Sequence, residues 1–180
     1  MAVHTSLSRS DIENITSNYN IGNLIFFQGI KEGIENTNYL LSTSSDKYIL
    51  TIYEERVKNK LLPFYLKIMV NSHKRGIKCP LPVQDNDNNV LNKFKKKYYG
   101  IFTFIPGVSS KQLDEKQCFA IGKELAKFHI VNKGVHKLHE NDFSLSFWND
   151  LYSECKSFIN EIIPNSVSIV EEEINFLNHN

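Results

Sequence analysis

The stretch Phe27–Glu54, FQGIKEGIENTNYLLSTSSDKYILTIYE, restricts the fold of this chain more than any other segment. Two runs rich in Tyr, Leu, Ile and Thr, residues 38–43 and 48–54, are separated by the polar cluster Ser44–Asp46, which predicts a β-hairpin. A strand and a turn that contains Gly33 and several small polar residues precede this hairpin. The pattern therefore predicts three consecutive strands with a glycine-bearing first turn.

The glycine-bearing turn has two interpretations. Such a loop can fold over a polyphosphate, because its backbone approaches closely and offers N–H donors. The same three strands also fit an ordinary meander that binds nothing. Neither G-x-x-x-x-G-K-[ST] nor G-x-G-x-x-G occurs in the sequence. The residues of this segment alone leave both interpretations open.

The rest of the chain is predicted to add a helix before the sheet, a helix and two strands after the hairpin, and then only helices. Strands first and helices afterwards indicate an α+β protein, with residues 1–105 as a small lobe, residues 106–180 as the start of a helical lobe, and Pro106-Gly107 at the joint. The predicted helices are 8–19, 62–75, 114–131, 146–163 and 167–177, and the further strands are 24–30, 90–94 and 98–105.

Composition narrows the class of protein. Hydrophobic residues make up 41% of the 180 residues, enough for a core, and the net charge of +1 gives no general attraction to nucleic acid or membranes. The three cysteines have neither disulfide-framework nor zinc-site spacing. No stretch reads as a signal peptide or a membrane span. We expect a cytoplasmic protein without nucleic-acid or membrane partners.

Several segments carry a resemblance to a known family. FQGIKEGIENTNY and YILTIYE, followed in order by LPFYLKIM, GIKCPLPV, IFTFIPG and IGKELAKFH, resemble the homoserine kinases of the aminoglycoside-phosphotransferase-like family. The resemblance runs from Met1 to Phe147 and fades beyond Trp148. It implies a protein-kinase-like fold: a five-stranded antiparallel small lobe with one long helix, followed by the first helices of an incomplete α-helical large lobe.

The resemblance also implies a nucleotide site. In that family the equivalent of residues 32–38 covers the ATP phosphates, and the strand before the joint contacts the adenine. Period-2 geometry places Ile49 and Thr51 on one face of the third strand, although Ile49 fits plain core equally well. The implied ATP-binding residues are Gly33, Ile34, Glu35, Asn36, Thr37, Asn38, Ile49, Thr51, Phe102, Thr103 and Phe104.

One departure from protein kinases concerns charge. Protein kinases place a phosphate-binding lysine on the third strand, paired with a glutamate on the next helix. Here Thr51 occupies the lysine register, and the predicted helix 62–75 contains no acidic residue. Lys31 and Arg56 are the candidates for the phosphate counter-charge, and each also fits an ordinary surface cation.

The remaining candidate residues have mainly structural interpretations. His129, on a predicted amphipathic helix, fits packing better than catalysis. His136 and His139 form an H-x-x-H pair without acidic or cysteine ligands beside it, which is weak evidence for a metal site. Trp148 fits core packing.

The sequence lacks the groups that would perform phosphoryl transfer. The resemblance implies a base from an H-x-D-x-x-x-x-N loop and Mg²⁺ ligands from that loop and a later Asp-containing segment, and none of the six histidines has Asp two residues on. We therefore predict no catalytic or metal residue here. The resemblance implies the amino-terminal part of a kinase that uses ATP and Mg²⁺ to phosphorylate L-homoserine in threonine biosynthesis, inactive by itself.

Two other functions remain open. A sister kinase of the same fold could act on choline or an aminoglycoside, and the chain could instead be a non-catalytic interaction module. Because the helical lobe is expected to be incomplete, the helices after Gly107 should leave apolar residues such as Ile121, Leu125 and Phe128 without partners, which predicts association in solution.

Overall fold

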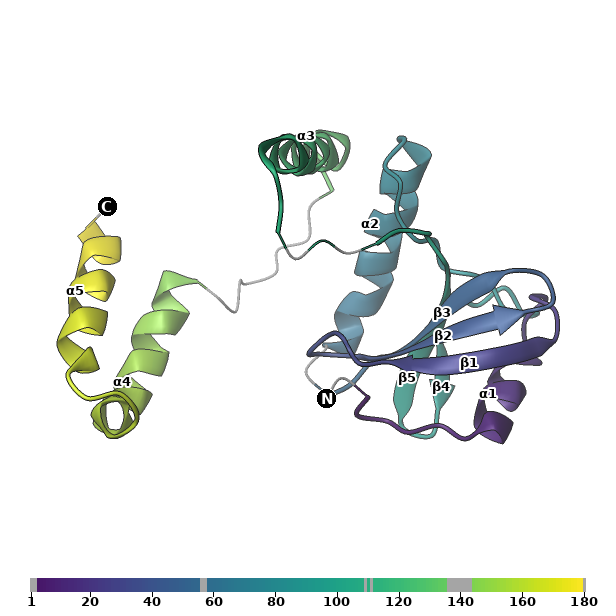
Figure 1. Ribbon diagram of the computed structural model, residues 1–180, viewed down its shortest axis with the longest axis horizontal. Helices are drawn as coiled ribbons and strands as arrows, with labels where there is room; N and C mark the ends of the chain where they lie inside the picture. The colour runs from purple at the N-terminus through teal and green to yellow at the C-terminus, as the bar shows by residue number, and fades with distance from the viewer. Residues whose placement is uncertain (1–2, 56–57, 109, 111, 136–143, 180) are drawn as a thin grey trace. The chain divides into compact units, whose positions relative to one another are not determined.

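The computed structural model describes residues 3–55, 58–108, 110, 112–135 and 144–179. Five antiparallel strands form one sheet in the order β1-β2-β3-β5-β4 (Figure 1). The predicted five-stranded antiparallel sheet is confirmed. Its strands are β1 Leu24–Ile30, β2 Thr37–Thr43, β3 Lys47–Ile52, β4 Asn92–Phe94 and β5 Lys97–Thr103.

The β2–β3 hairpin closes at the polar cluster that the sequence indicated. Thr43 organises this turn, because its hydroxyl accepts hydrogen bonds from the backbone N–H groups of Ser45 and Asp46, both at 3.2 Å. The backbone N–H of Thr43 in turn donates to the carbonyl of Asp46 at 2.9 Å. Small polar side chains that bond to nearby backbone are typical of such turns.

Helix α1, Arg9–Thr16, covers one face of the sheet. It begins with a capping box in which the Ser8 hydroxyl accepts from the backbone N–H of Asp11 and the Asp11 carboxylate accepts from the backbone N–H of Ser8. Ile12 and Ile15 from this helix are buried in the core. The same core contains alternate residues of the strands, since period-2 geometry sends them to one face: Tyr39, Leu41, Leu50, Ile52, Tyr99 and Ile101.

Helix α2, Leu62–Lys74, follows a short 3₁₀ turn, η1, Asn59–Leu61. Pro63 lies in the first turn of the helix, where backbone N–H groups have no intrahelical acceptor, so the N–H that proline lacks is not missed. After the helix the chain turns at Gly76, which has a φ of 83°. The PLPV segment beyond it is extended, as predicted. It pairs with β5 through Val83 N–H to Ile101 O at 2.8 Å and Thr103 N–H to Leu81 O at 2.9 Å.

The last two strands differ in length from the prediction. β4 begins at Asn92 instead of residue 90, and β5 ends at Thr103 instead of residue 105. Before β4, the Asp85 carboxylate accepts from the backbone N–H groups of Asp87 and Asn89 and holds residues 85–89 in a turn.

The chain divides into two compact units, Met1–His136 and Lys137–Asn180. Helix α3, Glu115–Val131, belongs to the first unit and is capped by Asp114. Its C-terminal end is tied to α2, because the Asn132 amide donates to the Ser72 hydroxyl at 2.8 Å and accepts from the Asn71 amide at 2.9 Å. The lobe boundary that we placed at residue 105 stays a prediction, since these units are defined by contacts and not by lobes.

The second unit is a helical hairpin of α4, Leu145–Ile162, and α5, Ser166–His179. Asn165 makes the turn between them in a left-handed conformation, with a φ of 64°. Lys156 and Glu171 pair across the hairpin at 2.5 Å. Across the residues that the structure describes, no helix combines the length and the apolar character that a bilayer crossing requires.

Candidate functional site

A small hollow lies on the face of the sheet opposite α1. It has a volume of about 210 Å³. Its walls come from β1, β2, β3, the loop between β1 and β2, and the residue directly after β5: Gln28, Gly29, Ile30, Glu32, Leu40, Ile49 and Phe104. Pockets that enclose a drug-sized ligand usually measure about 300–1,000 Å³. The hollow is therefore large enough for one part of such a ligand and not for the whole. We call it the sheet hollow.

The sheet hollow follows from strand register. Gln28 is opposite Leu40, Leu40 is opposite Ile49, and Ile49 is opposite Phe102, so one row of side chains crosses four strands on one face. Ile49 and Phe104, both predicted site residues, line the hollow, whereas Phe102 is 95% buried at the end of this row. Sequence reasoning missed Gln28 and Leu40, because alternation gives the face of each residue but not its partner on the next strand.

The neighbouring row on this face is more polar. Asn38 is opposite both Ile30 and Thr51, and Thr51 is opposite Gly100. The Thr51 hydroxyl donates to Oδ1 of Asn38 at 2.8 Å. The structure thus brings the predicted residues Asn38, Ile49 and Thr51 together on one face.

The loop of residues 31–36, between β1 and β2, is exposed along most of its length. Gly33 has a φ of 114°, a conformation that residues with a side chain rarely adopt, so this glycine is required by the backbone. Ile34 has 77% of its surface exposed, and Glu35 is exposed as well. We call residues 31–36 the glycine loop.

Thr37 lies on the other face of the sheet. It is opposite Ile52 and fully buried, and its hydroxyl donates to Oε1 of Glu54 at 2.7 Å. That hydroxyl also accepts from the backbone N–H groups of His4 at 2.9 Å and Thr5 at 3.0 Å. Any contact of Thr37 with a ligand beside the sheet hollow would therefore use its backbone and not its side chain.

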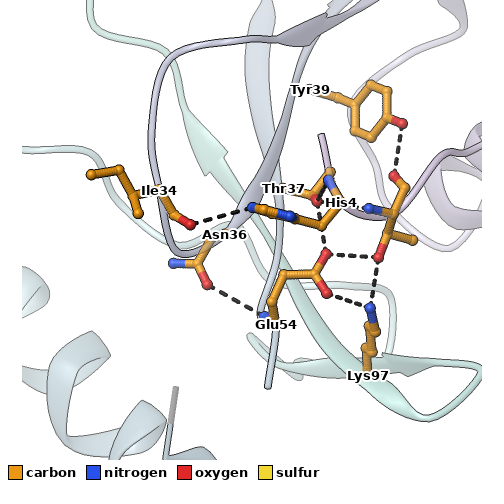
Figure 2. A network of polar contacts seen from close by, with 8 residues as sticks. His4, Ile34, Asn36, Thr37, Tyr39, Glu54 and Lys97 are labelled. Carbon is orange, nitrogen blue, oxygen red and sulfur yellow. Dashed lines mark hydrogen bonds and ion pairs between the residues drawn. The ribbon is translucent and has the colours of Figure 1, made fainter. Parts of the chain in front are cut away.

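Glu54 is the centre of a polar network that sequence reasoning did not find (Figure 2). Its carboxylate is 9% exposed, accepts from the Thr5 and Thr37 hydroxyls at 2.7 Å each, and forms an ion pair with Lys97. Burial alone would raise the pKa of Glu54, but the hydrogen bonds from Lys97, Thr5 and Thr37 and the charge of Lys97 outweigh it and lower the pKa. No local pattern could have indicated a pair 43 residues apart.

Phe104 is held at the edge of the hollow by its neighbours. Its backbone N–H donates to the carbonyl of Lys47 at 3.3 Å, and the Lys47 ammonium lies 5.9 Å from the centre of the Phe104 ring. The preceding N–H, of Thr103, is taken by the carbonyl of Leu81. Both amides are donors inside the fold, so a ligand recognised at these two residues would have to bond to their carbonyl oxygens.

Of the predicted cations and the histidines singled out from the sequence, the structure describes Lys31 and His129, and neither lines the sheet hollow. Lys31 is exposed in the glycine loop, and Arg56 lies outside the described residues. His129 is exposed on α3 with its ring 6.2 Å from that of Phe128. His136 and His139 lie outside the described residues.

Trp148 belongs to the α4–α5 hairpin. Trp148 lines an apolar groove of about 650 Å³ within the α4–α5 hairpin, with 46% of its surface exposed. Among the residues that the structure describes, no group of three or more His, Cys, Asp or Glu side chains could hold a metal ion.

A five-stranded antiparallel sheet with a hollow and a glycine loop on one face, followed by helices, defines a kinase-like small lobe. The chain belongs to the phosphotransferase enzyme family, whose family model matches residues 27–165.

Curated relatives agree with this family. The chain is 38% identical over 174 residues to a homoserine kinase of Gluconobacter oxydans, a match that covers 97% of this chain and 55% of that protein. It is 34% identical over 177 residues to a homoserine kinase of Beijerinckia indica, covering 98% of this chain and 55% of that protein. The chain therefore spans about half the length of the curated relatives it matches.

A solved structure has the same fold. The crystal structure of a spectinomycin phosphotransferase in complex with ADP and spectinomycin matches 93% of this chain and 59% of its own, with a TM-score of 0.56 and 14% sequence identity. At this identity the likeness establishes the kinase-like fold alone.

Proposed function

We propose that this chain is the ATP-binding part of a homoserine kinase, which transfers the γ-phosphoryl group of MgATP to the side-chain hydroxyl of L-homoserine. The observation that carries the proposal is the single sheet face that holds Asn38, Ile49 and Thr51, with Phe104 at one side and the glycine loop beyond Ile30. The homoserine kinases at 38% and 34% identity supply the acceptor.

The chemistry of that face suits the two ends of a nucleotide. Leu40, Ile49 and Phe104 offer an apolar wall of the kind that an adenine ring contacts. The glycine loop offers backbone N–H groups, which suit phosphate oxygens. Between them, the neutral Thr51–Asn38 pair occupies the register where protein kinases carry a lysine.

The groups that would complete catalysis are not among the motifs of this sequence. No His is followed by Asp two positions on, so the base that activates the acceptor hydroxyl and the Mg²⁺ ligands would lie outside these 180 residues. The chain should then bind MgATP and have no kinase turnover by itself.

Calorimetric titration with MgATP tests the nucleotide site directly. Saturable binding is expected, together with a rise in melting temperature as the ligand concentration increases. Absence of both at millimolar MgATP would contradict the proposal and favour a non-catalytic module.

A chimera tests the link to the kinase reaction. In the chimera, the 180 residues of this chain replace the matching segment of the Gluconobacter oxydans homoserine kinase, and the remaining residues come from that kinase. We expect ATP-dependent phosphorylation of L-homoserine by the chimera and none by the 180-residue chain. Turnover by the chain alone at the rate of the relative would contradict our placement of the catalytic groups. The complete gene product, assayed with homoserine, choline and spectinomycin, distinguishes the acceptors.

A further inference from the structure

We propose that Thr5, Glu54 and Lys97 are positioning residues for the glycine loop, holding it ready for nucleotide phosphates from the opposite face of the sheet. This inference rests on the proposed function, because it gives the loop a phosphate ligand. It assigns a role to a polar network whose members do not line the sheet hollow.

Two contacts tie the network to the loop, as Figure 2 shows. The carbonyl oxygen of Ile34 lies 3.3 Å from Nε2 of His4, which donates to it in the tautomer protonated at that nitrogen. The side-chain oxygen of Asn36 accepts from the backbone N–H of Glu54 at 3.4 Å. The loop is thus attached near its middle and at its end.

A third attachment lies at the base of the loop. Thr37 follows the loop directly, and its buried hydroxyl bonds to the backbone of His4 and Thr5 and to the Glu54 carboxylate. Glu54 in turn accepts from the Thr5 hydroxyl at 2.7 Å, and the same hydroxyl accepts from the Lys97 ammonium at 2.9 Å.

The network can affect a ligand only through the loop. The side chain of Thr37 lies on the core face, opposite Ile52, whereas the ligand-facing row contains Asn38 and Thr51. Glu54 is buried on the same side as Thr37. These residues therefore do not contact a nucleotide bound at the sheet hollow, and their effect on binding is indirect.

A preorganised loop matters because the loop has little packing of its own. Ordering a flexible loop costs conformational entropy, and a ligand that must order the loop loses that free energy from its affinity. A loop fixed before binding spares the ligand this cost. Loosening it should therefore weaken contacts to the phosphates and leave contacts to the base unchanged.

The test compares two ligands on two variants of one residue. Thr5→Val removes the hydroxyl that donates to Glu54 and accepts from Lys97, and it keeps the side-chain shape, whereas Thr5→Ser keeps the hydroxyl. Adenosine contains the base and ribose but no phosphate. We expect Thr5→Val to raise the dissociation constant of MgATP about tenfold, equivalent to about 1.4 kcal/mol, and that of adenosine less than about twofold. Thr5→Ser should resemble the wild type with both ligands.

Each outcome has a separate meaning. Equal losses for MgATP and adenosine in Thr5→Val, or no loss for either, would overturn the positioning role while leaving the proposed function intact. Failure of the wild-type chain to bind MgATP would overturn the proposed function and this inference with it. If Thr5→Val melts too low to titrate, Lys97→Met gives the same comparison, with Lys97→Arg as its conservative partner. The Lys97 side chain is 35% exposed, so its replacement disturbs the core less.

Discussion

The Thr51 hydroxyl donates a hydrogen bond to Oδ1 of Asn38, 2.8 Å away, across the β2–β3 pair. The resemblance to kinases predicts Thr51 at the register where protein kinases place a lysine, and both members of this pair are neutral. The absence of an acidic residue from α2 fits the same arrangement, since a half-buried lysine here would have no partner on that helix.

We expect Thr51→Val to lower the free energy of unfolding by about 1 kcal/mol, because it removes the donor to Asn38 from a half-buried site. Thr51→Ser keeps the donor and should lose less. Urea denaturation of the two variants measures the difference. Equal stability of Thr51→Val and the wild type would show that the hydrogen bond contributes nothing net.

Ile49 and Leu50 are adjacent in β3 and lie on opposite faces. Leu50→Ala should cost about 2–5 kcal/mol of stability, because Leu50 is fully buried in the core. Ile49→Ala should cost less, since Ile49 is half-buried, but it should weaken MgATP and adenosine binding alike because Ile49 lines the sheet hollow. Calorimetric titration and denaturation of both variants check this. An unchanged nucleotide affinity in Ile49→Ala would count against the proposed adenine wall.

Gly33→Ala should weaken MgATP binding about tenfold or more, because a φ of 114° strains any residue with a Cβ and the loop must change shape. Adenosine binding should change little. Gly122→Ala in α3 is the matched control, since no atom lies within 4 Å of the added methyl and alanine favours helix. An unaltered MgATP affinity in Gly33→Ala would mean that the loop shape does not matter for binding.

The Glu54 network should make the free energy of unfolding depend on pH in the acid range. The pKa of Glu54 is lower in the folded protein than in the unfolded chain, so the unfolded chain binds the proton more readily. The stabilisation is therefore present above about pH 4.3, the ordinary pKa of a glutamate, and is lost as the pH falls through the lower folded-state value. Thermal melting at several pH values should show this loss in the wild type.

A charge-removing variant isolates the Glu54 contribution. Glu54→Gln cannot titrate at this position, so its melting temperature should fall less steeply below about pH 4.3 than that of the wild type. Glu13→Gln, which removes an exposed carboxylate paired with Arg9 on α1, serves as the control. Identical acid profiles for Glu54→Gln and the wild type would contradict the predicted pKa shift.

The exposed apolar side chains of helix α3 lead us to expect that the chain associates in solution. Phe119, Ile121, Leu125 and Ile130 are all exposed on it, as the sequence indicated for Ile121 and Leu125, whereas Phe128 is half-buried. Large apolar side chains exposed on one helix favour contact with another molecule. In sedimentation velocity the average mass should rise with concentration. The double variant Ile121→Glu/Leu125→Glu should suppress the rise and Lys123→Glu should not. Concentration-independent behaviour of the wild type would refute the prediction.

Most helices and turns could be predicted from the sequence, because the residues that begin or end them lie next to them in the chain. Ser8 and Asp114 cap the helices that they precede, and the Ser44–Asp46 cluster closes the hairpin that it was expected to close. Strand ends were less accurate at β4 and β5, because a strand ends where pairing with its neighbours ends, which local signals do not give. The resemblance supplied the order of the elements and therefore the class of fold.

The site could be predicted only in part, because alternation along a strand shows which residues share a face but not which residues of the next strand lie beside them. Alternation placed Ile49 and Thr51 on one face of β3, but it could not show that Leu40 and Gln28 continue the row of Ile49 across β2 and β1. It also could not show that the Thr37 side chain belongs to the core while Asn38, the next residue, belongs to the ligand face.

The amino-acid sequence by itself determined the strands, the turns, the helices and the glycine that the loop needs, because each depends on residues close together in the chain. Only the tertiary structure decided that Thr5, Thr37, Glu54 and Lys97 meet around one buried carboxylate. That meeting requires strands from distant parts of the chain to pair in register, and the pairing depends on the energy of the whole sheet and not on any single segment.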